Sequence, residues 1–212
     1  PVISAPVGMS LGGGFEVVLH TDQVIANTNS VMGLVESFVG LVPAGGGCKE
    51  ILYRWNEKLG DPKKAAWNAF MNIGLGKVAN SPIEAEKLAL VNSSDSFHIN
   101  RDHMLGIAIS KLGKVSKTPK KGTLKLTGKD HFEEMKFWLE KNLSKGFLTE
   151  HDKTVGTEIA RIVTGGECAK GTLITEQELF DAERESFLRL AKSPQTQARI
   201  VSMLDLGQTT RN

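Results

Sequence analysis

The chain has 212 residues, 40% of them hydrophobic, which is enough for a buried core in at most two domains. Its 26 basic and 24 acidic residues give a net charge of +2, so charge predicts binding neither to nucleic acid nor to a membrane surface. Cys48 and Cys168 form no C-x-x-C pair and no apolar run is long enough to span a membrane, and both features favour the cytoplasm.

Strands and glycine turns alternate at the start of the chain. Residues 2–7 are short and apolar, as in a buried strand, and a glycine turn then leads into a helix expected at about residues 14–20. A second short strand is expected at residues 24–26. A second glycine turn at residues 40–47 opens into a helix that is expected to end at Leu59.

Signals for helix starts dominate the remainder of the chain. Two starts have a proline behind a capping side chain, and two have the spacing of a capping box. The residue pairs are Asp61 with Pro62, Ser81 with Pro82, Thr149 with Asp152, and Thr175 with Glu178.

A lysine-rich stretch lies between the two halves. Residues 111–129 hold seven lysines and no acid, together with the turn formers Pro119 and Gly122. Phosphate binding by these lysines is one interpretation, and a solvated linker or hairpin is the favoured one. We therefore expect one domain at residues 1–115 and a second at residues 116–212.

The stretch "GMSLGGGFE" at residues 8–16 is compatible with two chemistries, of which the first is a serine hydrolase. Its first five residues fit G-x-S-x-G, with Ser10 as the nucleophile and with Asp95 and His98 as the available partners. Those two partners are close neighbours in sequence, whereas this fold usually supplies them from separate strand ends. The motif also leaves the later glycines unexplained.

The second chemistry is an oxyanion site. Consecutive glycines before a helix let a ligand oxygen approach main-chain N–H groups, and the helix N-terminus adds positive potential there. Glu16 and Glu36 both lie among apolar neighbours and could handle two protons at such a site. Structural glycines and solvated or capping glutamates are the alternatives.

These residues resemble the crotonase, or enoyl-CoA hydratase, family from residue 1 to about residue 91. The family's "G-x-x-x-G-G-G-x-E" matches residues 8–16, and its acidic turn residue matches Asp22. Its "F-G-x-P-E-x-x-x-G-x-x-P-G-x-G-G" is written here as "MGLVESFVGLVPAGGG", residues 32–47, and its "S-A-x-E-A-x-x-x-G-L-V" matches residues 81–91. The resemblance implies an α/β fold, with an incomplete crotonase-like ββα core followed by a mainly helical C-terminal extension.

The resemblance also implies roles for individual residues. Gly13 would supply one N–H of the oxyanion hole to a thioester carbonyl. Glu16 would activate water and Glu36 would deliver a proton to C2, with the roles partly shared, so that a 2-enoyl-CoA becomes a 3-hydroxyacyl-CoA. Ala44 replaces a glycine whose N–H helps to hold the water, and Val35 replaces the proline usual before the second acid. Because alanine keeps the main-chain N–H, the change at Ala44 is expected to affect the geometry of the turn more than its ability to donate a hydrogen bond.

The end of the chain, "ERESFLRLAKSPQTQARIVSMLDLGQTTRN", resembles the C-terminus of two-function β-oxidation proteins in which a 3-hydroxyacyl-CoA dehydrogenase precedes the crotonase domain. This implies an acyl-CoA substrate and a parent that uses NAD, although this chain carries no dinucleotide fingerprint and is expected to hold no cofactor itself. Because Pro1 begins at the strand before the glycine turn, we expect a fragment with half a site and little activity alone. A non-catalytic role in assembly, with the dehydrogenase region or as a homo-oligomer, is the remaining alternative.

The histidines predict no metal site. They form no H-E-x-x-H motif and no pair four residues apart, so surface or packing roles are expected. They are His20, His98, His103, His131 and His151.

Overall fold

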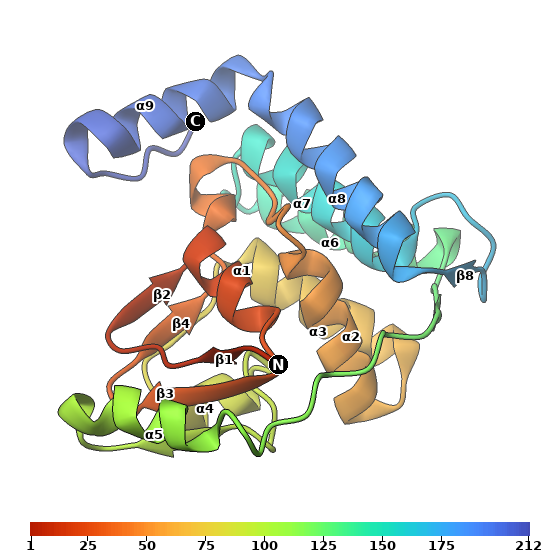
Figure 1. The fold of residues 1–212 in the computed structure, drawn as a ribbon. Helices are drawn as coiled ribbons and strands as arrows, with labels where there is room; N and C mark the ends of the chain where they lie inside the picture. Colours follow the sequence, from red (N-terminus) through yellow and green to blue (C-terminus); the bar gives the residue numbers. More distant parts are fainter. The chain divides into compact units, whose positions relative to one another are not determined.

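The structure is a computed structural model that describes all residues from 1 to 212. By internal contacts the chain divides into two compact units, unit 1 with residues 1–34 and 78–121 and unit 2 with residues 35–77 and 122–212. Figure 1 traces the chain through both units. The domain boundary expected after residue 115 divides the sequence into a crotonase-like part and an extension, whereas these two units are defined by packing. That boundary therefore stays a prediction.

Unit 1 contains two small sheets. The strand expected at residues 2–7 is found only at Ile3–Ser4, and it is half-buried, not buried as expected. Pro6 limits its length, because proline has no N–H to donate to a ladder. Parallel strands β1 (Ile3–Ser4), β3 (Gln23–Asn27) and β6 (Ser96–His98) form one sheet. The other sheet pairs β2 (Met9–Leu11) in parallel with β4 (Val31–Gly33), and β4 in antiparallel with β5 (Val78–Ala79).

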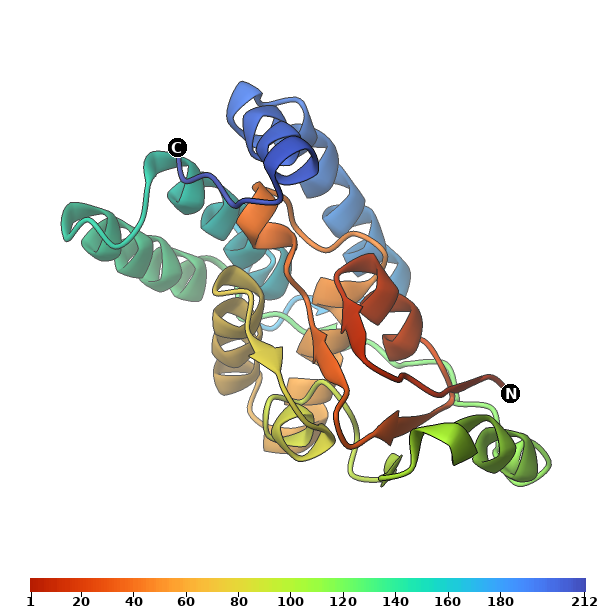
Figure 2. The same cartoon turned by 90° about the vertical axis from the view of Figure 1, so that its left-hand side faces the viewer.

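Helices cover the strands of unit 1. The expected first helix is confirmed as α1 (Gly13–Leu19), which buries Phe15 and Val18 and exposes Val17, as an amphipathic helix on a sheet does. Helix α5 (Met104–Lys111) lies beside β3 in both views (Figures 1 and 2). The other helical elements of unit 1 are α4 (Pro82–Lys87) and the 3₁₀ turn η2 (Arg101–His103).

Unit 2 is mainly helical. It contains the 3₁₀ turn η1 (Glu36–Val39), helices α2 (Gly47–Leu59), α3 (Pro62–Gly74), α6 (Lys129–Ser144), α7 (Glu150–Thr164), α8 (Glu176–Ala191) and α9 (Pro194–Leu206), and the short antiparallel pair β7 (Leu124–Lys125) and β8 (Leu173–Ile174). Its core includes Ile51, Phe70, Phe132, Ile159 and Leu179. In both views η1 lies beside α9 (Figures 1 and 2).

All four predicted helix starts are confirmed. Asp61 and Ser81 cap α3 and α4 with proline at the first helical positions, and Thr149 and Thr175 form complete capping boxes on α7 and α8. The helix after the second glycine turn also ends at Leu59, as expected. No helix of the structure has the length and apolar character needed to cross a membrane.

Candidate active site

The first glycine turn leaves its main chain open. Gly12 has φ 56°, a left-handed value that favours glycine, and its N–H donates to the carbonyl oxygen of Gly33 at 2.9 Å. The next two residues, Gly13 and Gly14, are exposed. First-turn N–H groups have no partner inside a helix, and those of Gly13 and Gly14 make no hydrogen bond elsewhere in the chain. Two N–H groups therefore face open space at the start of α1.

Glu16 is brought close to this turn. Its side chain is 9% exposed, and its Oε2 atom lies 4.0 Å from the position that a Cβ atom on Gly13 would take. One turn of α1 separates the two residues, so the carboxylate folds back toward the Gly13 main chain. Unit 1 thus places together a free N–H donor and a carboxylate.

The residues of the serine hydrolase alternative make other contacts. The Ser10 hydroxyl lies on β2 and donates to the carbonyl oxygen of Gly14 at 3.2 Å. The Asp95 carboxylate accepts the N–H groups of Val24 and Asn92, each at 2.8 Å. No hydrogen bond joins Ser10, Asp95 or His98 to one another, so the contacts of a catalytic triad are absent.

Glu36 is the first residue of η1 in unit 2 and is half-buried. The turn is closed by two main-chain hydrogen bonds. The Leu41 N–H donates to the carbonyl oxygen of Glu36 at 3.0 Å, and the Gly40 N–H donates to the carbonyl oxygen of Ser37 at 3.1 Å. Gly40 ends the turn with φ 79°. Val35, in the position where the family has proline, precedes the turn with φ −118°. Proline would require φ near −65°, so the departure noted in the sequence is matched by a different backbone.

Ala44 lies in the turn that precedes α2, also in unit 2. That helix begins behind Gly46, which offers no capping side chain. Glu183 of α8 replaces the missing cap, because its fully buried carboxylate accepts the N–H of Gly46 at 2.9 Å and also the N–H of Lys49. The turn that carries Ala44 is therefore held at its far end by a distant helix.

The structure thus brings two of the four predicted residues together, Gly13 and Glu16. Gly13 and Glu16 are neighbours in unit 1, whereas Glu36 and Ala44 lie on two successive turns of unit 2. Sequence reasoning missed Glu183, although a signal for it exists. The buried residues of α8 recur at helical spacing, and an acid stands among them: Leu179, Glu183, Ser186 and Leu190.

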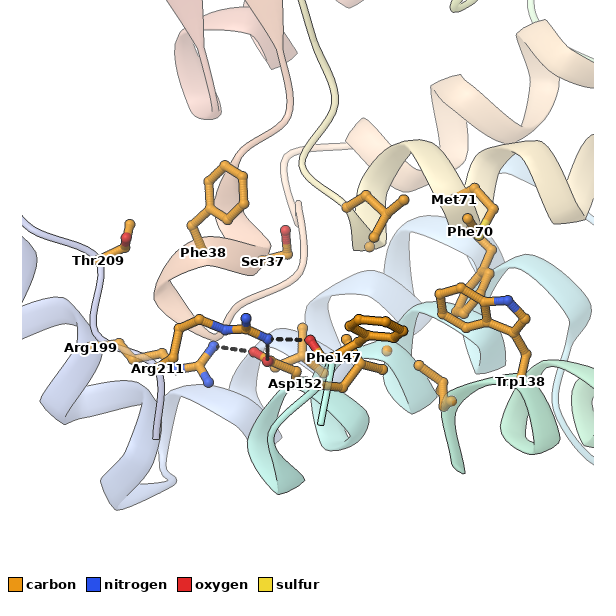
Figure 3. A pocket seen from close by; sticks show the side chains of 16 residues that line it. Ser37, Phe38, Phe70, Met71, Trp138, Phe147, Asp152, Arg199, Thr209 and Arg211 are labelled. Carbon is orange, nitrogen blue, oxygen red and sulfur yellow. Dashed lines mark hydrogen bonds and ion pairs between the residues drawn. The ribbon is translucent and has the colours of Figure 1, made fainter. Parts of the chain in front are cut away.

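Unit 2 also contains a pocket of about 330 Å³ (Figure 3). Its apolar side combines residues of η1, α3, α6 and α7 with the loop between the last two, and its polar side holds Asp152 with two arginines. The Asp152 carboxylate accepts from Arg199 at 2.8 Å and from Arg211 at 2.6 Å. Burial by itself would raise the pKa of Asp152, but the bonds from Arg211, from Thr149 N–H and from Arg199 hold that pKa below its usual value. The apolar lining includes Phe38, Phe70, Met71, Leu75, Trp138, Leu139, Phe147, Leu148 and Val155.

The histidines divide into surface and packing positions. His20 and His103 are exposed and His98 is half-buried. His131 is buried against Trp67, and His151 is buried against Thr196. The chain contains no group of three or more histidine, cysteine or acidic side chains arranged to hold a metal ion.

The fold is that of the crotonase family. The carnitinyl-CoA hydratase of Mycobacterium avium is similar with a TM-score of 0.57 at 18% identity, over 97% of this chain and 60% of that one. A carnitinyl-CoA dehydratase of Mycobacterium avium 104 gives a TM-score of 0.52 at 21% identity, over 93% of this chain and 58% of that one. Residues 1–96 match the model of the enoyl-CoA hydratase/isomerase family.

Two curated relatives extend the likeness along the chain. One, from Bacillus subtilis (strain 168) and named "Probable 3-hydroxyacyl-CoA dehydrogenase", is 35% identical over 216 residues, covering 100% of this chain and 27% of the relative. Another, from Rickettsia prowazekii (strain Madrid E) and named "Putative fatty acid oxidation complex trifunctional enzyme", is 30% identical over 197 residues, covering 92% of this chain and 25% of the relative. The chain spans about a quarter of the length of these relatives. Both resemblances expected from the sequence are confirmed.

Proposed function

We propose that the chain carries the hydratase site of a fatty acid β-oxidation enzyme and adds water to 2-enoyl-CoA thioesters. The observation that carries this proposal is the pairing of Gly13 with Glu16, an open N–H beside a carboxylate, within the segment that matches the hydratase family. The match to fatty acid oxidation proteins supports the same class of substrate.

The proposed chemistry needs two protons and one polarised carbonyl. The Gly13 N–H donates to the thioester oxygen and stabilises the negative charge that develops there. Glu16 takes a proton from water as its oxygen bonds to C3, and Glu36 gives a proton to C2, with both roles partly shared. The Ala44 N–H helps to hold the water. The carboxyl groups return to their starting states by proton exchange with solvent, so no cofactor is consumed.

The pocket of unit 2 is the proposed place for the acyl chain. Its apolar lining suits methylene groups, and its wall includes Ser37 and Phe38, which directly follow Glu36. Burial of each methylene contributes about 0.8 kcal/mol, which corresponds to about a fourfold change in affinity.

The parent protein is proposed to carry an NAD-dependent 3-hydroxyacyl-CoA dehydrogenase as well. The name of the Bacillus subtilis relative supports this, together with the small share of that relative that the chain covers. The two cysteines are both free thiols, which supports a reducing compartment such as the cytoplasm. Since these residues supply only one of the two N–H donors of the family's oxyanion hole, we propose that residues 1–212 alone turn over slowly.

A series of enoyl-CoA thioesters tests the proposal. The loss of enoyl absorbance is followed with crotonyl-CoA and with longer chains, using the protein as the cell produces it. We expect hydration of all of them and a kcat/KM that rises by up to about fourfold per methylene until the pocket is filled. Absence of hydration, combined with labelling of Ser10 by a fluorophosphonate probe, would favour the serine hydrolase instead.

A further inference from the structure

Two side chains from the C-terminal helices reach the end of the turn that carries Glu36. The Thr196 hydroxyl donates to the carbonyl oxygen of Gly40 at 2.8 Å, and the His151 Nε2 atom lies 2.8 Å from the same hydroxyl. Thr196 is fully buried and His151 is 5% exposed. Residues of α7 and α9 are therefore linked to η1 through a short buried chain of hydrogen bonds.

The direction of this chain follows from the number of protons. A hydroxyl has one proton, and the Thr196 proton is given to the Gly40 oxygen, which can only accept. The contact with His151 must then use a lone pair of the hydroxyl, so the Nε2 atom carries a proton and donates it. Burial, followed by the charge of Arg199, lowers the pKa of His151, while Asp152 raises it. The hydrogen-bond pattern therefore requires a proton on Nε2, and the lowered pKa favours the neutral ring.

The Thr196 and His151 side chains leave no room for a side chain at Gly40. A Cβ atom there would lie 2.7 Å from the Thr196 hydroxyl oxygen and 2.8 Å from the His151 Nε2 atom. The φ of 79° also favours glycine. The two side chains thus pack directly against the main chain of Gly40, and the Thr196 hydrogen bond ties its carbonyl oxygen to α9.

A shift at Gly40 is transmitted to Glu36 by the turn itself. Only three residues separate the two, and the hydrogen bonds from Gly40 N–H to Ser37 and from Leu41 N–H to Glu36 close the turn. Such a turn moves as one body. A displacement of a reacting group by about 1 Å can lower a rate by about 10².

We propose that Thr196 and His151 are positioning residues that fix the place of the Glu36 carboxylate, so that the helical extension takes part in the reaction without touching the substrate. The inference rests on the proposed hydratase function. Because Glu36 delivers its proton in the transition state, its displacement should lower kcat and leave KM for crotonyl-CoA nearly unchanged.

Three variants of the protein, as the cell produces it, test the inference. Thr196→Val keeps the shape of the side chain and removes the donor, whereas Thr196→Ser keeps the hydroxyl. Thr164→Val is the matched control, because Thr164 is equally buried but its hydroxyl bonds only to Ala160 and Gly166 at the end of α7. We expect Thr196→Val to lower kcat by about 10 to 10² with KM changed less than about threefold, and the other two variants to stay near wild type. A kcat for Thr196→Val equal to that of Thr164→Val would overturn the inference.

Two further measurements keep the inference testable if the first comparison fails. If Thr196→Val does not fold, His151→Leu takes its place, with His151→Gln as the variant that retains an N–H donor. If the wild-type protein hydrates no enoyl-CoA, the proposed function is wrong, and hydrogen exchange of the Leu41 amide decides the positioning claim. Faster exchange in Thr196→Val than in Thr164→Val supports the claim that Thr196 fixes the η1 turn in place, and equal exchange contradicts that claim.

Discussion

Gly13 has a backbone conformation that any residue can adopt, so the turn itself does not require glycine there. The positive φ of the turn belongs to Gly12. What glycine provides at position 13 is access, since its exposed main chain has only the Glu16 carboxylate beside it. The absence of a side chain is thus better explained by ligand approach than by folding.

Gly13→Ala should therefore separate activity from stability. The added methyl group would stand 4.0 Å from Glu16 Oε2 and meet no other atom, while alanine favours the helix by about 0.5 to 1 kcal/mol. We expect unchanged or higher stability in urea and a hydration rate lowered by roughly 10², because the methyl group obstructs the N–H donor. Gly14→Ala, with open space around it, is the control. An active Gly13→Ala protein would remove Gly13 from the site.

The two buried histidines predict how stability depends on pH. Burial lowers the pKa of both histidines. For His131, the charge of Lys63 adds to this shift, while Glu134 and Asp61 oppose it. For His151, the charge of Arg199 adds to the shift, while Asp152 opposes it. The folded state therefore binds fewer protons than the unfolded state. The stabilisation is present above the unfolded pKa, about 6.5, and is lost as the pH falls through the lower folded values.

Urea unfolding at about pH 7.5 and about pH 5.5 measures this loss. We expect the free energy of unfolding to fall at the lower pH, and to fall less in His131→Phe, which cannot titrate. His103→Gln, at an exposed position, should leave the dependence unchanged. Stability that increased toward the lower pH would contradict the sign of both shifts.

Among the helices, local starts were predictable and distant supports were not. The caps at Asp61, Ser81, Thr149 and Thr175 depend on residues within one turn, so a single sequence contains the whole signal. Glu183 caps a helix more than 130 residues away from it. Its partner could not be identified from spacing alone, because only tertiary packing determines which helix N-terminus lies opposite a buried acid.

Glu183→Ala should show how much α2 depends on α8. The change leaves the N–H groups of Gly46 and Lys49 without this acceptor, and each unsatisfied buried group costs about 1 to 3 kcal/mol. Urea unfolding should show a loss in that range or above it. Glu185→Gln on the same helix is exposed and should change stability by less than about 0.5 kcal/mol. Equal effects of the two changes would mean that Glu183 is not a cap.

For the whole molecule, the sequence motifs located the candidate residues but not their supports. The pairing of Gly13 with Glu16 follows from one turn of one helix, and the motif specifies it completely. The hold on Glu36 comes instead from Thr196 and His151, which lie in a part of the chain where no motif points to the site. The contact of Thr196 with Gly40 joins residues 156 positions apart, and such a separation leaves no periodic signal.

We propose that Glu16 and Glu36 act on one substrate. The most direct measurement is the hydration of crotonyl-CoA by Glu16→Gln, Glu36→Gln and the double variant of the protein as the cell produces it, with the exposed Glu86→Gln and Glu57→Gln as controls. We predict that each single change lowers kcat/KM by roughly 10² to 10⁴ and that the double change lowers it by less than the product of the two. Wild-type rates in either single variant, or losses that simply multiply, would contradict a shared site.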